Sequence, residues 1–270
     1  MSEMTDIGGI MEMLCSTSDM SFTEYQQDKV DHYNSLEGKL HEKDGHNCGI
    51  CKNKGYIARL DGDCEVHTPC KCLKTRAALK RARASGLNDI LEEYTFDKYI
   101  ATDGWQKNIK ECAMQFCKDE DARWFYIGGQ VGSGKTHLCT AICGYYIKAG
   151  LDVKYMLWSD ESKKLKALIT DKTYQDEIAV YKDADVLYID DFFKVRQGET
   201  PSSADVNLAF EIINHRLLSK DKITVISGEK LLDELINYDE ATMSRISQKV
   251  GRYKISVNAD RGKNYRLRGA

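Results

Sequence analysis

Residues 129–136, GQVGSGKT, constrain the fold more than any other part of this 270-residue chain. They fit the pattern G-x-x-x-x-G-K-[ST], with an apolar run before them (124–128) and helical spacing after them (135–150). In that context glycines let backbone N–H groups turn onto phosphate oxygens, and the helix N-terminus adds a favourable dipole. The sequence therefore predicts a strand–loop–helix unit that binds the phosphates of a nucleotide.

Two side chains of this loop have a predicted chemical role. Lys135 is expected to reach the β- and γ-phosphates, and the hydroxyl of Thr136 is expected to coordinate Mg²⁺. The predicted nucleotide-binding set consists of Gly129, Gly132, Ser133, Gly134, Lys135, Thr136 and His137.

From residue 124 onward, apolar runs alternate with helical patterns, which indicates an α/β fold. The strands are predicted over 124–128, 153–158, 185–191, 223–227 and 253–257. The helices are predicted over 135–150, 160–169, 173–182, 202–219, 230–237 and 240–249. Such an order predicts a mostly parallel five-stranded sheet with helices on both faces. Because ligands bind outside the carboxyl ends of parallel strands, the glycine loop, the aspartate pair and residues 227–229 are expected at one edge.

Two consecutive aspartates end the third predicted strand, VLYIDD. Asp190 is predicted to hold Mg²⁺, and Asp191 is predicted to orient or deprotonate the attacking water. Arg245, on the helical segment EATMSRISQ, is a candidate to enter the nucleotide site of a neighbouring subunit and stabilise transition-state charge.

Four of the ten cysteines form two close pairs, Cys48-x2-Cys51 and Cys70-x-Cys72, with 18 residues between the pairs. In a reducing compartment such pairs favour a metal site over disulfides, and four thiolates suit a closed structural Zn²⁺ site. Free thiols are the alternative. The spare candidate ligands are Cys64, His46 and His67. Four further cysteines lie on helical patterns and are expected to be small core residues: Cys112, Cys117, Cys139 and Cys143.

Charge is unevenly distributed, although the net charge is only −3. Residues 1–45 hold ten acidic and three basic side chains, whereas residues 71–83 hold six basic side chains and no acidic ones. This contrast is typical of a protein that handles both a protein partner and a polyanion. The chain has no apolar run long enough to span a membrane and no basic start typical of a signal peptide, so a cytoplasmic location is expected.

Together the motifs GGQVGSGKTHL, VLYIDDFFK, TVISGEK, ATMSRI and KNYRLR resemble the AAA+ ATPases of the DnaC/DnaI helicase-loader type. The segments CGICKNKGYI, CKCL and SGLNDILEEYTFDKY are similar to the zinc module and linker of loaders from Gram-positive bacteria and their phages. The resemblance covers roughly residues 45–268.

The resemblance implies further residue roles. Arg245 matches the arginine finger of the family, and Arg266 is similar to its second sensing arginine. Glu229 stands nearest to the first sensor, which is commonly Asn. The few residues after the last predicted strand imply a core without a full helical lid.

The family also implies an ATP-dependent loader that places a hexameric DnaB-type helicase on single-stranded DNA and assembles with the helicase ring. The implied regions are an acidic helical partner-binding region (1–45), a zinc module (46–75), a basic linker helix (76–95) and an AAA+ domain (96–270). Candidate DNA contacts are Lys163, Lys164, Lys166, Lys194 and Arg196.

Three other functions remain open on the sequence. The ATPase pattern also suits a transposase-helper ATPase of the IstB type, although the zinc module favours a loader. A small-molecule phosphotransferase would need a substrate pocket and an arginine-bearing lid, and neither is visible in the sequence. An ATP-binding switch without significant hydrolysis is the third alternative.

Overall fold

The structure, a computed structural model, describes residues 21–87, 90–196 and 198–267. The chain divides into two compact units, with the boundary between Arg76 and Ala77. The finer division of residues 1–95 made from the sequence stays a prediction, and its first 20 residues lie outside the described part. No helix in the described ranges is both long and apolar enough to cross a membrane.

From residue 21 to the start of α4 (Cys72–Ala82), the first unit contains two helices and a β-hairpin. Helix α2 (Phe22–Ser35) follows the N-cap Ser21. The Ser21 hydroxyl accepts from the Glu24 N–H, and the Ser21 N–H donates to the Glu24 carboxylate, which makes a capping box. Helix α3 (Leu40–Asp44) follows. Strands β1 (Tyr56–Asp61) and β2 (Cys64–Pro69) pair antiparallel around a two-residue turn in which Gly62 has φ +61°. The turn residues are Gly62 and Asp63, a two-residue hairpin signal from which these strands were not predicted.

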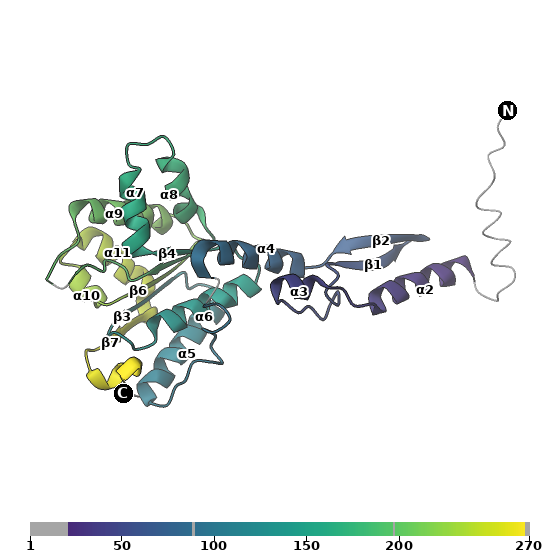
Figure 1. Cartoon of the computed structure of the whole chain (residues 1–270), viewed down its shortest axis with the longest axis horizontal. Helices are drawn as coiled ribbons and strands as arrows, with labels where there is room; N and C mark the ends of the chain where they lie inside the picture. The colour runs from purple at the N-terminus through teal and green to yellow at the C-terminus, as the bar shows by residue number, and fades with distance from the viewer. Residues whose placement is uncertain (1–20, 88–89, 197, 268–270) are drawn as a thin grey trace. The chain divides into compact units, whose positions relative to one another are not determined.

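Helix α4 (Cys72–Ala82) carries the chain into the second unit, where it continues as a π-helical turn, Arg83–Leu87. The second unit is the predicted α/β domain (Figure 1). Its sheet has the order β4-β5-β6-β3-β7, and all four strand pairs are parallel. The strands are β3 (Trp124–Gly129), β4 (Val153–Leu157), β5 (Val186–Asp190), β6 (Ile223–Gly228) and β7 (Lys254–Val257).

The helices of this unit cover both faces of the sheet, as predicted (Figure 1). They are α5 (Gly104–Lys118), α6 (Lys135–Lys148), α7 (Trp158–Ala167), α8 (Tyr174–Asp183), α9 (Ser203–Leu217), α10 (Leu232–Leu235) and α11 (Glu240–Val250). Three 3₁₀ turns follow α11: η2 (Gly251–Tyr253), η3 (Arg261–Lys263) and η4 (Tyr265–Leu267).

Alternation along β3 separates two buried clusters. Phe125 and Ile127 pack in the cluster that contains residues of α5 and α6, whereas Trp124 and Tyr126 pack in the cluster that contains residues of α7–α9 and α11. This is the two-residue period of a strand buried on both faces. The fold class predicted from the sequence is therefore confirmed.

Many predicted boundaries differ from the structure by one or two residues, and three of these differences lie close to the site. Trp158 begins α7 instead of ending the second strand. The third strand ends at Asp190, and Asp191 has a left-handed backbone with φ +53°. The helix predicted over 230–237 is reduced to the four residues of α10. Each error lies at the carboxyl end of a strand or just beyond one, where tertiary contacts decide the backbone.

Candidate nucleotide-binding site

The glycine loop joins β3 to α6 in the conformation that its glycines permit. Gly129, Gly132 and Gly134 have φ values of +110°, +73° and +87°, which side chains rarely tolerate. Lys135 is buried, and its Nζ donates to the carbonyl oxygens of Gly129 (2.8 Å) and Gln130 (2.7 Å). Burial lowers the pKa of Lys135, and nearby carboxylates oppose that shift. The ammonium thus lies against the inner carbonyls of the loop.

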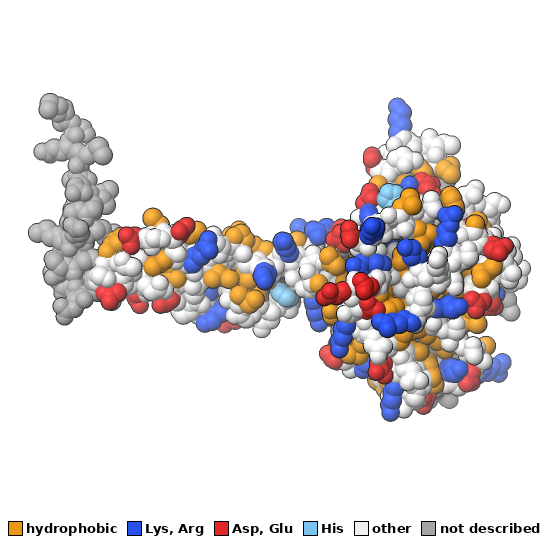
Figure 2. Space-filling view, turned by 180° about the vertical axis from the view of Figure 1, so that it is seen from behind, with side chains coloured by type: hydrophobic (Ala, Val, Ile, Leu, Met, Phe, Trp, Pro, Cys, Tyr) orange, Lys and Arg blue, Asp and Glu red, His pale blue; other side chains and the backbone are white. Residues whose placement is uncertain are grey.

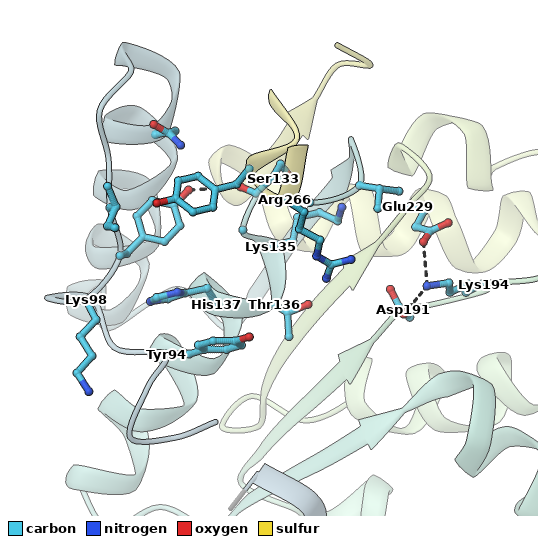
Figure 3. Close-up of a pocket in the computed structure, with 17 residues that line it drawn as sticks. Tyr94, Lys98, Ser133, Lys135, Thr136, His137, Asp191, Lys194, Glu229 and Arg266 are labelled. Carbon is cyan, nitrogen blue, oxygen red and sulfur yellow. Dashed lines mark hydrogen bonds and ion pairs between the residues drawn. The ribbon is translucent and has the colours of Figure 1, made fainter. Parts of the chain in front are cut away.

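A cavity of about 400 Å³ opens in front of this loop (Figure 3). Residues 131–137 form one wall, and Asp191, Glu229 and Arg266 come from distant parts of the chain. The volume lies in the range of small-molecule sites. The structure therefore brings the predicted loop, the second aspartate and both sensor candidates to one cavity, while their roles stay predictions.

Asp190 lies at the end of β5 and is almost fully buried. Its Oδ1 is 3.4 Å from the hydroxyl of Thr136 and also accepts a hydrogen bond from Ser227. Its Oδ2 accepts from the hydroxyl of Tyr155 at 3.1 Å. Hydroxyl and carboxylate oxygens are ligands that Mg²⁺ accepts, so Thr136 and Asp190 fit the predicted metal. Ser227 was expected at this edge, but its hydrogen bond to Asp190 and that of Tyr155 were not predicted, and both fix the orientation of the carboxylate.

Lys194 lies between two acidic side chains of the cavity. Its Nζ is 2.9 Å from Asp191 Oδ2 and 2.9 Å from Glu229 Oε1 (Figure 3). Burial lowers the pKa of Lys194, but the two carboxylates outweigh it and the pKa is raised. Sequence reasoning assigned Lys194 only to DNA contact, because the distant Glu229 gives no local signal.

Arg266 reaches the cavity on a short C-terminal segment that lies against the phosphate loop. The backbone N–H of Tyr265 donates to the carbonyl of Gly132 at 2.9 Å, and that of Asp260 donates to Gln130 Oε1 at 2.8 Å. Arg266 therefore needs no helical lid to line the site, which the sequence did not indicate.

Aromatic residues that precede the first strand of the sheet in the sequence line the cavity, which was not predicted. Tyr94 stacks on His137 with ring centroids 4.8 Å apart, and Tyr99 meets the same imidazole edge-on at 5.1 Å. A ring nitrogen of His137 is 2.8 Å from the carbonyl oxygen of Thr95, which ties this segment to α6. Burial lowers the pKa of His137. The aromatic residues of EEYTFDKY, directly before the ATPase core, were the available signal.

The predicted arginine finger lies away from this cavity. Arg245 is exposed on α11, and its Nη1 donates to Asn214 Oδ1 at 2.9 Å. Arg245 does not line the described cavity of its own chain. A role in a neighbouring subunit therefore stays a prediction.

The candidate DNA contacts differ in their surroundings. Lys164 pairs with Glu161 at 2.6 Å, and Lys166 pairs with Asp205 at 2.5 Å. On the face seen in Figure 2, acidic and basic side chains are interspersed over the second unit. Two of the three lysines of α7 therefore have a carboxylate that compensates their charge.

The four predicted zinc ligands meet in the first unit. The Sγ atoms of Cys48, Cys51, Cys70 and Cys72 all lie within 4.8 Å of one another, and all four residues are buried. The pairs Cys48–Cys70 and Cys51–Cys72 are 3.8 Å and 3.5 Å apart. Tetrahedral Zn²⁺ with Zn–S bonds of about 2.3 Å places its sulfurs about 3.8 Å apart, so the cluster fits this ion.

The spare ligands are not part of this thiol group. Cys64 is exposed at the start of β2, and His67 pairs with Glu65 at 2.8 Å. The chain turns sharply after Cys51, where Lys52 and Asn53 have positive φ, and this turn is called the knuckle. The backbone N–H of Gly55 donates to Cys51 Sγ at 3.2 Å.

Sequence comparison relates this chain to a family of bacterial ATPase domains. Residues 90–251 match the family described as the bacterial DnaA ATPase domain. The phage-like element PBSX protein XkdC of Bacillus subtilis is 32% identical over 241 residues, covering 83% of this chain and 87% of XkdC. The uncharacterized protein YqaM of the same organism is 33% identical over 211 residues, covering 73% of this chain and 66% of YqaM. The chain thus spans slightly less than two thirds of YqaM.

Among solved structures, that of the DnaC helicase loader has a TM-score of 0.50 at 19% identity. The match covers 64% of this chain and 99% of that one. At this identity the likeness concerns the fold, which is the same α/β architecture.

Proposed function

The chain belongs to the family of the bacterial DnaA ATPase domain, and from this membership we propose that it is an ATP-dependent loader of a ring-shaped replicative helicase. The observation that carries the proposal is the meeting of Lys135, Thr136, Asp191 and Arg266 around one nucleotide-sized cavity. Asp190 is buried beside the cavity, with its Oδ1 3.4 Å from the Thr136 hydroxyl. The likeness to the DnaC helicase loader supports the choice of partner.

Hydrolysis at this site uses groups from several strands. Thr136 and Asp190 would hold Mg²⁺, which would neutralise phosphate charge. Lys135 binds the phosphates from the loop, and Asp191 orients the attacking water. Arg266 approaches the phosphates from the C-terminal segment, and Arg245 of a neighbouring copy completes the site in the assembled ring.

The first unit is proposed to bind the helicase. Its described part exposes five large apolar side chains that a partner could cover: Phe22, Tyr25, Leu36, Ile50 and Tyr56. A structural Zn²⁺ held by the four cysteines keeps the knuckle and the hairpin together, because so small a unit has little other core. Single-stranded DNA is proposed to bind the second unit.

The test is co-purification of the chain with the replicative helicase of its host, with and without ATP. Co-purification together with faster loading of the helicase on single-stranded DNA is the expected result. Lys135→Ala should abolish nucleotide binding, and Arg245→Ala should spare binding but reduce turnover in the assembly. A chain that ignores the helicase but binds a transposase is a transposition helper, and one that binds ATP without releasing phosphate beside helicase and DNA is a switch.

A further inference from the structure

We propose that Asn264 and Gln130 are positioning residues, which hold Arg266 at the nucleotide cavity by fixing the C-terminal strap to the phosphate loop. The C-terminal strap comprises residues 258–267, which follow β7. This inference rests on the proposed function, because it takes the cavity to bind ATP and assigns Arg266 to the phosphates. It adds what holds Arg266 in place when its support is a short segment instead of a helical lid.

The first observation is that the C-terminal strap is tied to the phosphate loop at both of its ends. Just before the strap, the carbonyl of Val257 accepts the backbone N–H of Gln130 at 2.8 Å. The side-chain Oε1 of Gln130 then accepts the N–H of Asp260 at 2.8 Å. Near the other end, the N–H of Tyr265 donates to the carbonyl of Gly132 at 2.9 Å. The position of the strap is therefore set by the loop that is expected to bind the phosphates.

The second observation is the place of the Asn264 side chain. Its amide lies against Gly132, so closely that a Cβ on Gly132 would overlap with Asn264 Oδ1. The same Oδ1 accepts the backbone N–H of Arg266 at 3.1 Å, a turn that asparagine side chains favour. Gly132 therefore meets two demands, because its φ of +73° shapes the loop and its missing side chain leaves room for Asn264. One amide thus connects the loop to the backbone of the arginine.

The third observation separates the arginine from the residues that support it. Tyr265 and Arg266 line the cavity, and Figure 3 shows the Arg266 guanidinium pointing into it. The side chain of Arg266 is exposed, so its position depends on the backbone that carries it. Asn264 and Gln130 are not among the residues that line the cavity. They therefore act on a bound nucleotide through the C-terminal strap and the loop.

The consequence is that Arg266 is in position before a nucleotide arrives. A guanidinium on a loose segment loses conformational freedom when it binds a phosphate, and fixing the segment in advance reduces that cost. Because the C-terminal strap is tied to the loop that precedes Lys135, the two cations keep a constant spatial relation. Breaking either support should therefore weaken ATP binding by releasing Arg266.

The experiment measures the affinity of the full chain for a non-hydrolysable ATP analogue with Mg²⁺ by calorimetry. Arg266→Met should weaken this affinity about tenfold or more, because it removes a charged hydrogen-bond donor. Asn264→Ala and Gln130→Met should each weaken it about fivefold, which is the usual effect of one lost hydrogen bond. Asn264→Ser should lie between Asn264→Ala and the wild type, because serine forms the same turn more weakly.

The decisive measurement combines two substitutions. The double variant Asn264→Ala with Arg266→Met should bind the analogue as Arg266→Met alone does, because Asn264 acts through Arg266. Effects that multiply in the double variant would mean that Asn264 supports the site in another way, and they would overturn the proposal. Asn258→Ala is the matched control, because Asn258 is an exposed asparagine in the same strap. It should bind the analogue as the wild type does.

Two further outcomes separate this inference from the proposed function. Tryptophan fluorescence during unfolding checks that each variant is folded, and Gln130→Met tests the C-terminal strap even if the Asn264 variants fold poorly. Wild-type affinity in both Asn264→Ala and Gln130→Met overturns the positioning role alone. A wild type that does not bind the analogue overturns the proposed function and this inference together. Failure of helicase loading appears in the co-purification and leaves the measured affinities readable.

Discussion

Arg216→Met should strongly destabilise the ATPase unit, although Arg216 lies away from the candidate site. Arg216 is fully buried on α9, and its guanidinium makes five hydrogen bonds without a carboxylate partner. The acceptors are the carbonyls of Tyr181, Lys182, Ala184 and Ile223 and the hydroxyl of Thr224. Burial lowers the pKa of Arg216 to about 10, so the group remains protonated at neutral pH.

The magnitude follows from what the substitution leaves behind. Four carbonyls at the end of α8 and the start of β6 lose a donor inside the protein, and each group left unsatisfied costs about 1–3 kcal/mol. The carbonyl of Lys182 keeps the Lys222 ammonium as a donor at 2.9 Å, so the cost falls on the carbonyls of Tyr181, Ala184 and Ile223. Burying the guanidinium costs the wild type several kcal/mol of desolvation free energy. The variant avoids this cost, which offsets part of its loss of stability. The net expectation is a loss of about 3–5 kcal/mol in the free energy of unfolding, as for other broken buried charge networks. For a unit of this size that corresponds to a midpoint lowered by about 6–20 °C.

Tryptophan fluorescence during thermal or urea unfolding measures the stability of the second unit, which contains Arg216. All three tryptophans, Trp105, Trp124 and Trp158, belong to the second unit. Lys220→Met, an exposed substitution a few residues further along, serves as the control and should leave the midpoint unchanged. A loss below about 1 kcal/mol in Arg216→Met would refute the reasoning, because it would mean that water or neighbouring groups satisfy the carbonyls.

Three further predictions concern the glycine loop, the metal and an acidic group. Gly134→Ala should weaken ATP binding measured by calorimetry, because a Cβ there would lie 2.8 Å from the ring of Tyr99 at a backbone φ of +87°; wild-type affinity would contradict this. Strong chelation should release one Zn²⁺ per chain and disrupt the first unit, with the tryptophan-detected transition unchanged; no bound zinc would count against the site. Hydrogen bonds, the Tyr253 hydroxyl first, lower the pKa of Asp119 from 3.8 to about 2. Its contribution to stability is therefore present above about pH 4 and lost as the pH falls towards 2, and Asp119→Asn should flatten this part of the stability curve.

The sequence predicted the sheet and the phosphate loop because both depend on local signals. Glycines at 129, 132 and 134 are needed for positive φ, and alternating apolar runs and helical patterns reveal buried parallel strands. The cysteine spacing likewise indicated which thiols gather. The hairpin of the first unit was not predicted, although its Gly62-Asp63 turn is a local signal of the same kind.

The pairing of polar side chains within the site had no local signal. Tyr155 and Ser227, which bind Asp190, and Glu229, which shares Lys194 with Asp191, are separated from those partners by 35 or more residues. Nothing in the spacing of such residues specifies which carboxylate a hydroxyl or an ammonium will reach. The same holds for Arg216, which looks like any surface arginine on a helix.

By itself the sequence determined that this chain forms an α/β nucleotide-binding domain with a thiol cluster before it, because glycine conformations, strand periodicity and ligand spacing act within a few residues. Only the tertiary structure decided how the charges of the site are paired, how Arg266 reaches the loop without a lid and which segment supplies the aromatic residues that line the cavity. Those outcomes depend on the order of strands in the sheet, which brings distant strand ends together, and electrostatic pairing acts on distance in space alone.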